Sequence, residues 1–434
     1  MKYYSLNRNT PDVDFKTATL KGQAPDKGLY FPESIPSVDK AFLQNLPGFS
    51  HEEIGFRVMR PYTQDSIPDD VLFRMITETV AFPFPLVRVT DNIYSLELFH
   101  GPTLAFKDVG ARFMSRCLGY FSREKDVRTT VLVATSGDTG GAVASGFLGV
   151  EGVDVVILYP SGKVSPVQEL QLTTCEKNIT ALEVAGSFDD CQAMVKEAFM
   201  DAELMARRNL TSANSINVAR WLPQQLYYFF ALRQWTDAGH PPVIAVPSGN
   251  LGNLCAGLLA HVSGLPVNHF IAACNSNDAV VDYLLSGNYH PRQATPTISN
   301  AMDVGNPSNF VRILELFGKD HRQITSHISG YRVTDTQTMK ALHDLYHQHG
   351  YIADPHGAVG YDALETYLSH HPDQKGIFLE TAHPVKFPDT VEAATGLKVP
   401  TPEQVRELFS KQKKSILIRP EFAALKEVLM GSVF

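Results

Sequence analysis

The segment TVLVATSGDTGGAVASGFLGVEGVDVVILYP, residues 130–160, contains two short apolar runs separated by small residues. TVLVAT (130–135) and VDVVILYP (153–160) have the length and the branched side chains of buried strands. AVASGFLGV, which lies between them, has the composition of a helix packed on a sheet. This order predicts a βαβ unit with parallel strands whose two faces are covered by helices.

The same alternation continues toward the C-terminus. An amphipathic helix is predicted at 189–208, where apolar residues recur every three or four positions. Further strands are predicted at NITALEVAG (178–186), VIAVP (243–247), HFIAAC (269–274) and KGIFLETAH (375–383). The pattern therefore predicts an α/β protein of two lobes with a cleft between them, each lobe a parallel sheet flanked by helices.

The chain divides by composition into three regions. The sequence predicts helices and proline-rich turns in residues 1–90 and a helical tail in residues 391–434. Between them, 91–390 is the expected core, with a smaller lobe at about 110–210 and a larger lobe made of the rest.

Bulk composition excludes several classes of protein. With 434 residues, 44% of them hydrophobic, the chain can bury large cores without a metal or disulfides. A net charge of −8 gives no reason to expect nucleic acid or an anionic membrane as a partner. Five scattered cysteines without a CxxC pair favour reduced thiols in the cytoplasm and no metal site. No signal peptide or long apolar span is recognisable, so neither export nor membrane insertion is expected.

The stretch VIAVPSGNLGNLCAGLL (243–259) places a glycine-rich turn between a strand and a helix. Such a turn directs backbone N–H groups and the positive end of the helix toward one point, which suits a phosphate. The glycines lack the spacing of dinucleotide-binding and Walker A loops. Taken alone, the loop fits a tight turn with glycines for packing equally well.

A second polar loop, TSGDTGG (135–141), follows the strand at 130–135. Ser136, Asp138 and Thr139 therefore lie at the carboxyl end of a strand, where α/β sheets bind ligands. An aspartic protease would need an all-β setting and a second copy of the Asp-Thr-Gly triplet, and neither is present.

A third polar cluster, SANSINVAR (212–220), precedes a large apolar helix expected at 221–232. Ser215 and Arg220 suit a second, planar anion. Helix capping explains Ser212 or Asn214 equally well, but it does not explain Arg220.

Lys107 stands alone in HGPTLAFKD (100–108), behind a Gly-Pro turn and mostly apolar residues. A single lysine is usually a solvated surface residue. Desolvation, however, lowers the pKa of an amine and makes it a nucleophile that can form a Schiff base. Two anion sites and this lysine together favour a phosphorylated cofactor whose aldehyde Lys107 holds as an imine.

Six motifs carry a family resemblance: PTLAFKD, ATSGDTGGAVA, VPSGNLGN, SNAMDV, DPHGAVGYDAL and TAHPVKF. In this order they resemble the threonine synthase family, most closely its bacterial and fungal branch. That family is similar to tryptophan synthase β and the other fold-type II pyridoxal phosphate enzymes. The resemblance implies a pyridoxal phosphate site in the cleft, with Lys107 as the Schiff-base and catalytic lysine.

The resemblance also implies roles for other residues. Asp138 would contact the ring 3-hydroxyl of the cofactor, Thr381 would face its pyridine nitrogen, and His356 would lie near the site. The loop that would hold the cofactor phosphate consists of Gly249, Asn250, Leu251, Gly252 and Asn253. The residues that would bind the substrate phosphate are Thr139, Ser215, Arg220, Asn250 and, with a weaker match, Lys163. No metal is implied.

One departure from the family pattern concerns the phosphate loop. Relatives often have GNFGD where this chain has Leu251 and Asn253. The cradle works mainly through backbone N–H groups, so we expect little loss.

The implied activity is that of a lyase in the last step of threonine biosynthesis. It would convert O-phospho-L-homoserine and water to L-threonine and phosphate by γ-elimination and β-addition, with Lys107 as the base at Cα. A serine or threonine dehydratase or a cysteine synthase would share Lys107 and the glycine loop, and a phospho-lyase would share nearly every motif. A monomer and a homodimer fit the sequence equally well.

Overall fold

The computed structural model describes residues 1–122, 128–237 and 239–431 of the chain. These residues form two compact units, each assembled from segments that are distant in sequence. The first unit contains Met1, Phe31–Phe106 and Trp221–Pro400, and the second contains Lys2–Tyr30, Lys107–Arg220 and the residues from Thr401 onward. The domain boundaries at residues 90 and 390 were placed by composition, and they remain a prediction.

The first unit is built on a six-stranded sheet with the order β11-β10-β9-β12-β4-β3. All neighbouring strands are parallel except β3 and β4, which are antiparallel. Every residue of the central strands β9 and β12 is buried, as their unbroken apolar sequences predict. The strands are β3 (Leu86–Arg88), β4 (Ile93–Glu97), β9 (Val243–Pro247), β10 (His269–Cys274), β11 (Ile328–Arg332) and β12 (Gly376–Glu380).

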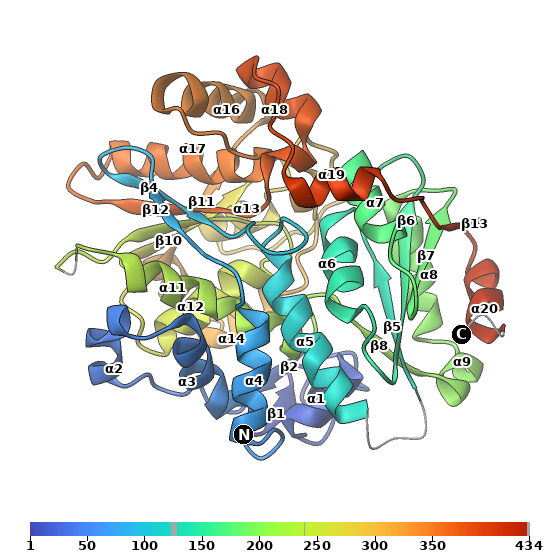
Figure 1. Ribbon diagram of the computed structural model, residues 1–434. Coiled ribbons are helices and arrows are strands. Elements are labelled where there is room, and N and C mark those ends of the chain that lie inside the picture. Colours follow the sequence, from blue (N-terminus) through green and yellow to red (C-terminus); the bar gives the residue numbers. More distant parts are fainter. Residues whose placement is uncertain (123–127, 238, 432–434) are drawn as a thin grey trace. The chain divides into compact units, whose positions relative to one another are not determined.

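Helices cover both faces of this sheet. Figure 1 shows α16 (Asp335–His349), α17 (Pro355–Ser369) and α18 (Pro388–Thr395) on one face, and α11 (Leu226–Gln234) and α12 (Gly252–Val262) on the other. The core under α17 contains Ala245, Ile271, Val359, Leu364 and Phe378. The remaining helices of this unit are α2 (Lys40–Gln44), α3 (His51–Thr63), α4 (Asp69–Thr79), α13 (Ala279–Ser286), α14 (Phe310–Leu316) and α15 (His321–His327), with the 3₁₀ turns η1 (Leu46–Gly48), η2 (Leu222–Gln225), η3 (Asn300–Met302) and η4 (Pro384–Lys386).

The second unit contains a five-stranded sheet with the order β13-β7-β6-β5-β8. All of its strand pairs are parallel, so the predicted class, an α/β protein of parallel sheets flanked by helices, is confirmed for both units. The strands are β5 (Thr129–Ala134), β6 (Val153–Pro160), β7 (Ile179–Val184), β8 (Asn209–Ser212) and β13 (Ile416–Ile418).

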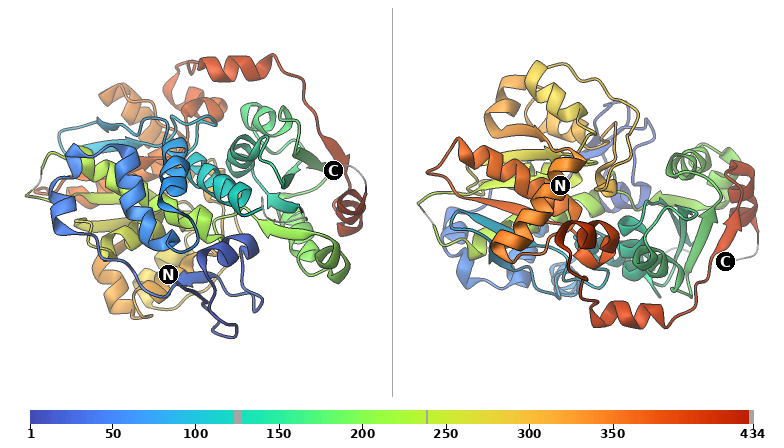
Figure 2. Two further views of the ribbon diagram at one scale, coloured as in Figure 1. Left: turned by 60° about the horizontal axis from the view of Figure 1, so that its bottom comes forward. Right: turned by 90° about the horizontal axis from the view of Figure 1, so that it is seen from above.

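Helices α5 (Lys107–Ser122) and α6 (Asp138–Phe147) pack against each other beside this sheet, and α8 (Phe188–Ala198) packs on β5 and β6. Both views in Figure 2 show α20 (Phe422–Met430) next to the same unit. The other helices of this unit are α1 (Phe15–Lys21), α7 (Pro166–Thr173), α9 (Ala202–Arg207) and α19 (Glu403–Phe409). Strand β1 (Tyr3–Ser5) also belongs to it, while β2 (Tyr30–Pro32) and α10 (Val218–Trp221) lie where the chain passes from one unit to the other.

Three elements differ from the sequence expectation. The single helix predicted at 189–208 is two helices, α8 and α9, because the Asp201 side chain accepts the N–H of Leu204 and starts a new helix. The helix expected at 221–232 begins as the 3₁₀ turn η2, which contains Pro223, a residue without an N–H. The expected helical tail contains strand β13, which pairs with β7.

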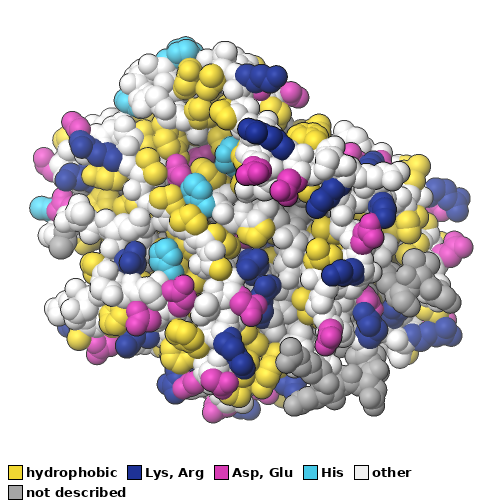
Figure 3. Space-filling view, viewed as in Figure 1, with side chains coloured by type: hydrophobic (Ala, Val, Ile, Leu, Met, Phe, Trp, Pro, Cys, Tyr) yellow, Lys and Arg dark blue, Asp and Glu magenta, His cyan; other side chains and the backbone are white. Residues whose placement is uncertain are grey.

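One face of the molecule has a surface of mixed charge (Figure 3). On the face drawn in Figure 3, Lys and Arg side chains lie among Asp and Glu side chains, consistent with a net charge of −8 spread over many groups. Within the described residues, none of the helices has both the length and the apolar character needed to span a membrane. Over the same residues, no group of three or more His, Cys, Asp or Glu side chains is arranged to hold a metal ion.

Candidate active site

Lys107 is the first residue of α5 and is half-buried. Two of the three residues before it are hydrogen-bonded to the segment that follows β12. The N–H of Phe106 donates to the carbonyl oxygen of Thr381 at 2.9 Å, and the N–H of His383 donates to the carbonyl of Leu104 at 3.0 Å. Leu104 has a φ of 58°, a left-handed conformation that is uncommon for leucine. These bonds place Thr381 beside the residue that immediately precedes Lys107.

The glycine loop lies between β9 and α12, as its sequence predicts. Leu251 has left-handed backbone angles (φ 59°, ψ 12°), and α12 begins at Gly252 without a capping side chain. The first N–H groups of a helix have no carbonyl partner within it and carry the positive end of its dipole. The loop therefore has the geometry of an anion cradle.

The loop is packed closely against η3. A Cβ added at Gly249 would lie 2.8 Å from the Cα of Met302, which explains glycine at this position. Asn250 accepts the N–H of Ser308 on its side-chain oxygen at 2.6 Å. The Asn253 side chain donates to the carbonyl of Pro247 at 2.8 Å, so it holds the loop itself, and only its backbone is available to an anion.

Asp138 opens α6 in the second unit and is buried. Gln168 of α7 donates from Nε2 to its carboxylate at 2.9 Å, while the Gln168 oxygen accepts the N–H of Ser165. Gly137, at φ 138°, has no room for a side chain because Gln168 would lie 2.4 Å from its Cβ. Gln168 was not among the expected site residues; the capping-box pattern Ser-x-x-Gln at 165–168 is the signal in the sequence that marks a helix start there.

Thr135 was also not among the expected site residues. Its hydroxyl accepts the N–H groups of Gly137 at 3.0 Å and Gly140 at 2.9 Å. It therefore shapes the turn that presents Asp138 and Thr139.

Arg220 is buried in α10, and its Nη1 donates to the carbonyl of Ala213 at 2.6 Å. A Cβ on Gly110 would lie 2.7 Å from the Arg220 carbonyl oxygen, so Arg220 packs on α5 one helical turn after Lys107. Ser215 is half-buried in the loop that leads to α10. Thr139 is half-buried in α6, and Lys163 is exposed in the loop between β6 and α7.

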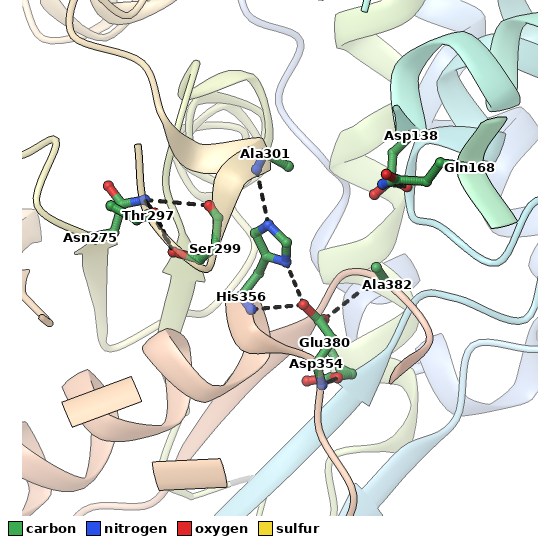
Figure 4. Close-up of polar contacts among 10 residues, drawn as sticks. All are labelled: Asp138, Gln168, Asn275, Thr297, Ser299, Ala301, Asp354, His356, Glu380 and Ala382. Atoms are coloured by element: carbon green, nitrogen blue, oxygen red, sulfur yellow. Dashed lines mark hydrogen bonds and ion pairs between the residues drawn. The ribbon is translucent and has the colours of Figure 1, made fainter. Parts of the chain in front are cut away.

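Figure 4 shows a buried histidine that joins two loops of the first unit. The Nε2 of His356 accepts the N–H of Ala301 at 3.2 Å, and its Nδ1 faces the Oδ1 of Asp354. The other oxygen of Asp354 accepts the N–H of Ala382 at 3.2 Å. Because Nε2 accepts a hydrogen bond, the proton of the neutral ring is on Nδ1 and donates to Asp354.

Two further ionisable groups flank Thr381. Burial, reinforced by the nearby Asp354, raises the pKa of Glu380 well above its usual range, so the protonated form of this carboxyl is favoured. Burial, with a smaller contribution from His100, lowers the pKa of His383 to about 4. The N–H of Val385 donates to Nδ1 of His383, which is consistent with a neutral ring. Thr381 therefore stands in the chain between two groups whose burial favours the uncharged form.

Residues 80–382 match the family described as pyridoxal-phosphate dependent enzyme. Residues 2–80 match the threonine synthase N terminus, and residues 357–429 match the threonine synthase C-terminal region. The chain is 42% identical over 433 residues to threonine synthase from Haemophilus influenzae, and the alignment covers 100% of both chains. The chain belongs to the threonine synthase family.

Solved structures of threonine synthases agree with this assignment. The Escherichia coli enzyme superposes with a TM-score of 0.92 at 41% identity and covers 99% of both chains. The pyridoxal-phosphate-bound threonine synthase from Brucella melitensis has a TM-score of 0.92 at 36% identity, covering 99% of this chain and 98% of its own. The chain is accordingly a lyase that depends on pyridoxal phosphate, as the family resemblance predicted.

The residues of the candidate site fit this cofactor. The start of α12, where Leu251 provides no side-chain cap, would offer backbone N–H groups to a phosphate, and Gly249 lets the loop pack closely on η3. Lys107 would supply an amine, and the buried Thr381 would supply a hydroxyl rather than a carboxylate.

Proposed function

We propose that this chain converts O-phospho-L-homoserine and water to L-threonine and phosphate. The proposal is supported most strongly by its agreement with threonine synthases over the whole length of the chain. In the reaction Cβ loses a proton, the bond between Cγ and the phosphate oxygen breaks, and a proton is added at Cγ. Water then adds its hydroxyl at Cβ, and its remaining proton leaves with the released phosphate. The scattered, unpaired cysteines favour a reducing cytoplasm as the place of action.

Lys107 and the loop 249–253 would hold the cofactor, Lys107 through its amine and the loop through backbone N–H groups. When bound, pyridoxal phosphate withdraws electrons from the substrate and makes the protons on its carbon atoms acidic. The Lys107 amine, when it is not bonded to the cofactor, would serve as the base that takes the proton from Cα of the substrate.

Asp138 and Thr381 would contact the ring of the cofactor. Gln168 holds the Asp138 carboxylate by a hydrogen bond, and this carboxylate would contact the 3-hydroxyl. The hydroxyl of Thr381 would face the pyridine nitrogen, where a carboxylate would keep that nitrogen protonated. A hydroxyl makes the ring a weaker electron acceptor, which suits elimination at Cβ and Cγ.

Arg220 would bind the leaving phosphate of the substrate, with Ser215, Thr139 and Asn250 as neutral partners. Its guanidinium is buried and lies against the helix that begins at Lys107. A buried arginine binds a phosphate through two parallel hydrogen bonds. A relative that uses an unphosphorylated substrate has no need for this charge. Lys163 is exposed, so we assign it at most a role in attracting the anion.

The test is to incubate the purified protein with pyridoxal phosphate and O-phospho-L-homoserine, and to measure phosphate and threonine together. Equal amounts of both products support the proposal. Phosphate without threonine would indicate a phospho-lyase, and turnover of serine or threonine with no phosphate release from phosphohomoserine would indicate a dehydratase.

A further inference from the structure

His356 and Asp354 form a connection between two loops that the sheet itself does not join. Ala301 lies in η3, and Ala382 lies in the segment after β12. His356 accepts the N–H of the first, and Asp354 accepts the N–H of the second. His356 and Asp354 are both buried, with exposed fractions of 2% and 0%. Water therefore does not compete for these hydrogen bonds.

Each end of this connection touches a part of the candidate cofactor site. Ala301 adjoins Met302, whose Cα lies 2.8 Å from the position of a Cβ at Gly249. Ala382 follows Thr381 directly and forms an antiparallel bridge with Ala105, two residues before Lys107. The imidazole is therefore one link between the phosphate loop and the strand end that carries Thr381.

We propose that His356 and Asp354 are positioning residues that fix the spacing between the loop 249–253 and Thr381. This inference rests on the proposed function, because that spacing matters only if one rigid ligand contacts both places. Pyridoxal phosphate is such a ligand, since its ring nitrogen and its phosphate are held at a nearly constant separation. A displacement of about 1 Å at either end would weaken one of the two contacts.

Helix capping alone does not account for the pair. Asp354 caps α17 by accepting the N–H of His356 at 2.7 Å, and an asparagine would cap that helix equally well. The cap makes no use of the imidazole. The bond from Ala301 to Nε2 is the contact that a capping role leaves unexplained.

Two variants distinguish the two hydrogen bonds of the His356 ring, one to Asp354 and one from Ala301. The side-chain nitrogen of asparagine can replace Nδ1–H, so His356→Asn keeps the bond to Asp354 and loses the bond from Ala301. The side-chain oxygen of glutamine reaches the position of Nε2, so His356→Gln keeps the acceptor for Ala301. His269→Asn is the matched control, because His269 is a half-buried histidine of β10 whose Nε2 pairs with Ser329 at 2.7 Å, in the same unit.

The experiment compares the affinities of each apoprotein for pyridoxal 5′-phosphate and for pyridoxal, which lacks the phosphate. We expect His356→Asn to reduce the ratio of the two affinities about tenfold or more and to shift the absorbance maximum of the bound cofactor. His356→Gln should recover part of the ratio, and His269→Asn should leave it at the wild-type value. An unchanged ratio in His356→Asn would overturn the inference, because a purely structural loss weakens both ligands alike. If His356→Asn does not fold, the same ratio of affinities is measured in His356→Gln and Asp354→Asn. A lowered ratio in Asp354→Asn supports the inference. Wild-type ratios in both variants overturn it.

Hydrogen exchange of the apoprotein tests the connection without the cofactor. The amide of Ala301 should exchange faster in His356→Asn than in the wild type, and equal rates would overturn the inference. If the wild-type protein itself fails to bind pyridoxal phosphate, the proposed function is wrong. The exchange result still decides whether the hydrogen-bonded connection exists.

Discussion

The backbone N–H of Phe106 donates to the carbonyl oxygen of Thr381 at 2.9 Å. Phe106 immediately precedes the lysine that we assign to the cofactor amine, and Thr381 carries the hydroxyl that we assign to the ring nitrogen. The hydrogen bond uses only main-chain atoms, so it does not depend on the side chain at 381. The side chain can therefore be changed without breaking the link to Lys107.

Thr381→Val should keep the fold and impair catalysis. Valine has the shape of threonine without its hydroxyl, and losing a buried hydrogen bond costs about 1–3 kcal/mol, so we expect a roughly tenfold to hundredfold lower kcat. Thr381→Ser keeps the hydroxyl and should stay within about threefold of the wild type. Steady-state kinetics and the melting temperature of all three proteins check this, and full activity in Thr381→Val would refute a role for the hydroxyl.

Gly110→Ala should impair binding of the phosphorylated substrate. Its new Cβ would lie 2.7 Å from the carbonyl oxygen of Arg220 and 3.1 Å from its Nε, so the arginine must move. We expect KM for O-phospho-L-homoserine to rise about tenfold, which corresponds to about 1.4 kcal/mol. Gly119→Ala is the control on the same helix, because its Cβ meets only a methyl group of Val150, at 2.9 Å. Equal KM values in the two variants would contradict a role for Arg220 in binding the substrate.

Gln168→Glu should destabilise the protein in a pH-dependent way. The substitution sets a second carboxylate against Asp138 in a buried place, and we expect a loss of about 2–4 kcal/mol at pH 8. Like charges raise the folded-state pKa values of such a pair, so the folded protein binds more protons than the unfolded chain. The loss should therefore shrink as the pH falls toward 5. Gln168→Met loses the hydrogen bond without adding charge, so urea unfolding should give a loss that is the same at both pH values.

The stability of the Glu380→Gln variant, compared with that of the wild type, should increase as the pH rises. Burial and Asp354 raise the pKa of Glu380 above its ordinary value of 4.5, so the folded state holds a proton that the unfolded chain releases above that pH. The proton on Glu380 therefore makes the free energy of unfolding of the wild type fall as the pH rises, by at most about 1.4 kcal/mol per pH unit. Glutamine does not titrate and removes this dependence. The difference in melting temperature between Glu380→Gln and the wild-type apoprotein should increase in favour of the variant from pH 5.5 to 8. A constant difference would mean that Glu380 is ionised throughout.

The features that our sequence analysis could predict are local ones. The apolar runs at 130–135 and 243–247 and the glycine turn after the second of these became strands and a helix start, because strand, turn and helix signals act over a few residues. The six motifs also identified the family, since their order is far more specific than any one of them.

The supporting contacts could not be predicted, because they join residues far apart in the chain. Gln168 and Asp138 are 30 residues apart, Ser308 and Asn250 are 58 apart, and Ala382 and Asp354 are 28 apart. Only the packing of the sheets and helices brings such pairs together. The side-chain bond from Asn253 to the carbonyl of Pro247 was likewise not predictable, although the sequence predicted that this loop acts through its backbone N–H groups.

The central claim is that the Lys107 amine holds pyridoxal phosphate. Reduction of the cofactor-loaded protein with borohydride, followed by proteolysis and mass spectrometry, locates the pyridoxyl group on one residue. The account predicts the adduct on Lys107 and its absence from the Lys107→Ala protein. An adduct on another lysine, such as the fully buried Lys386 of η4, or no adduct at all, would contradict it.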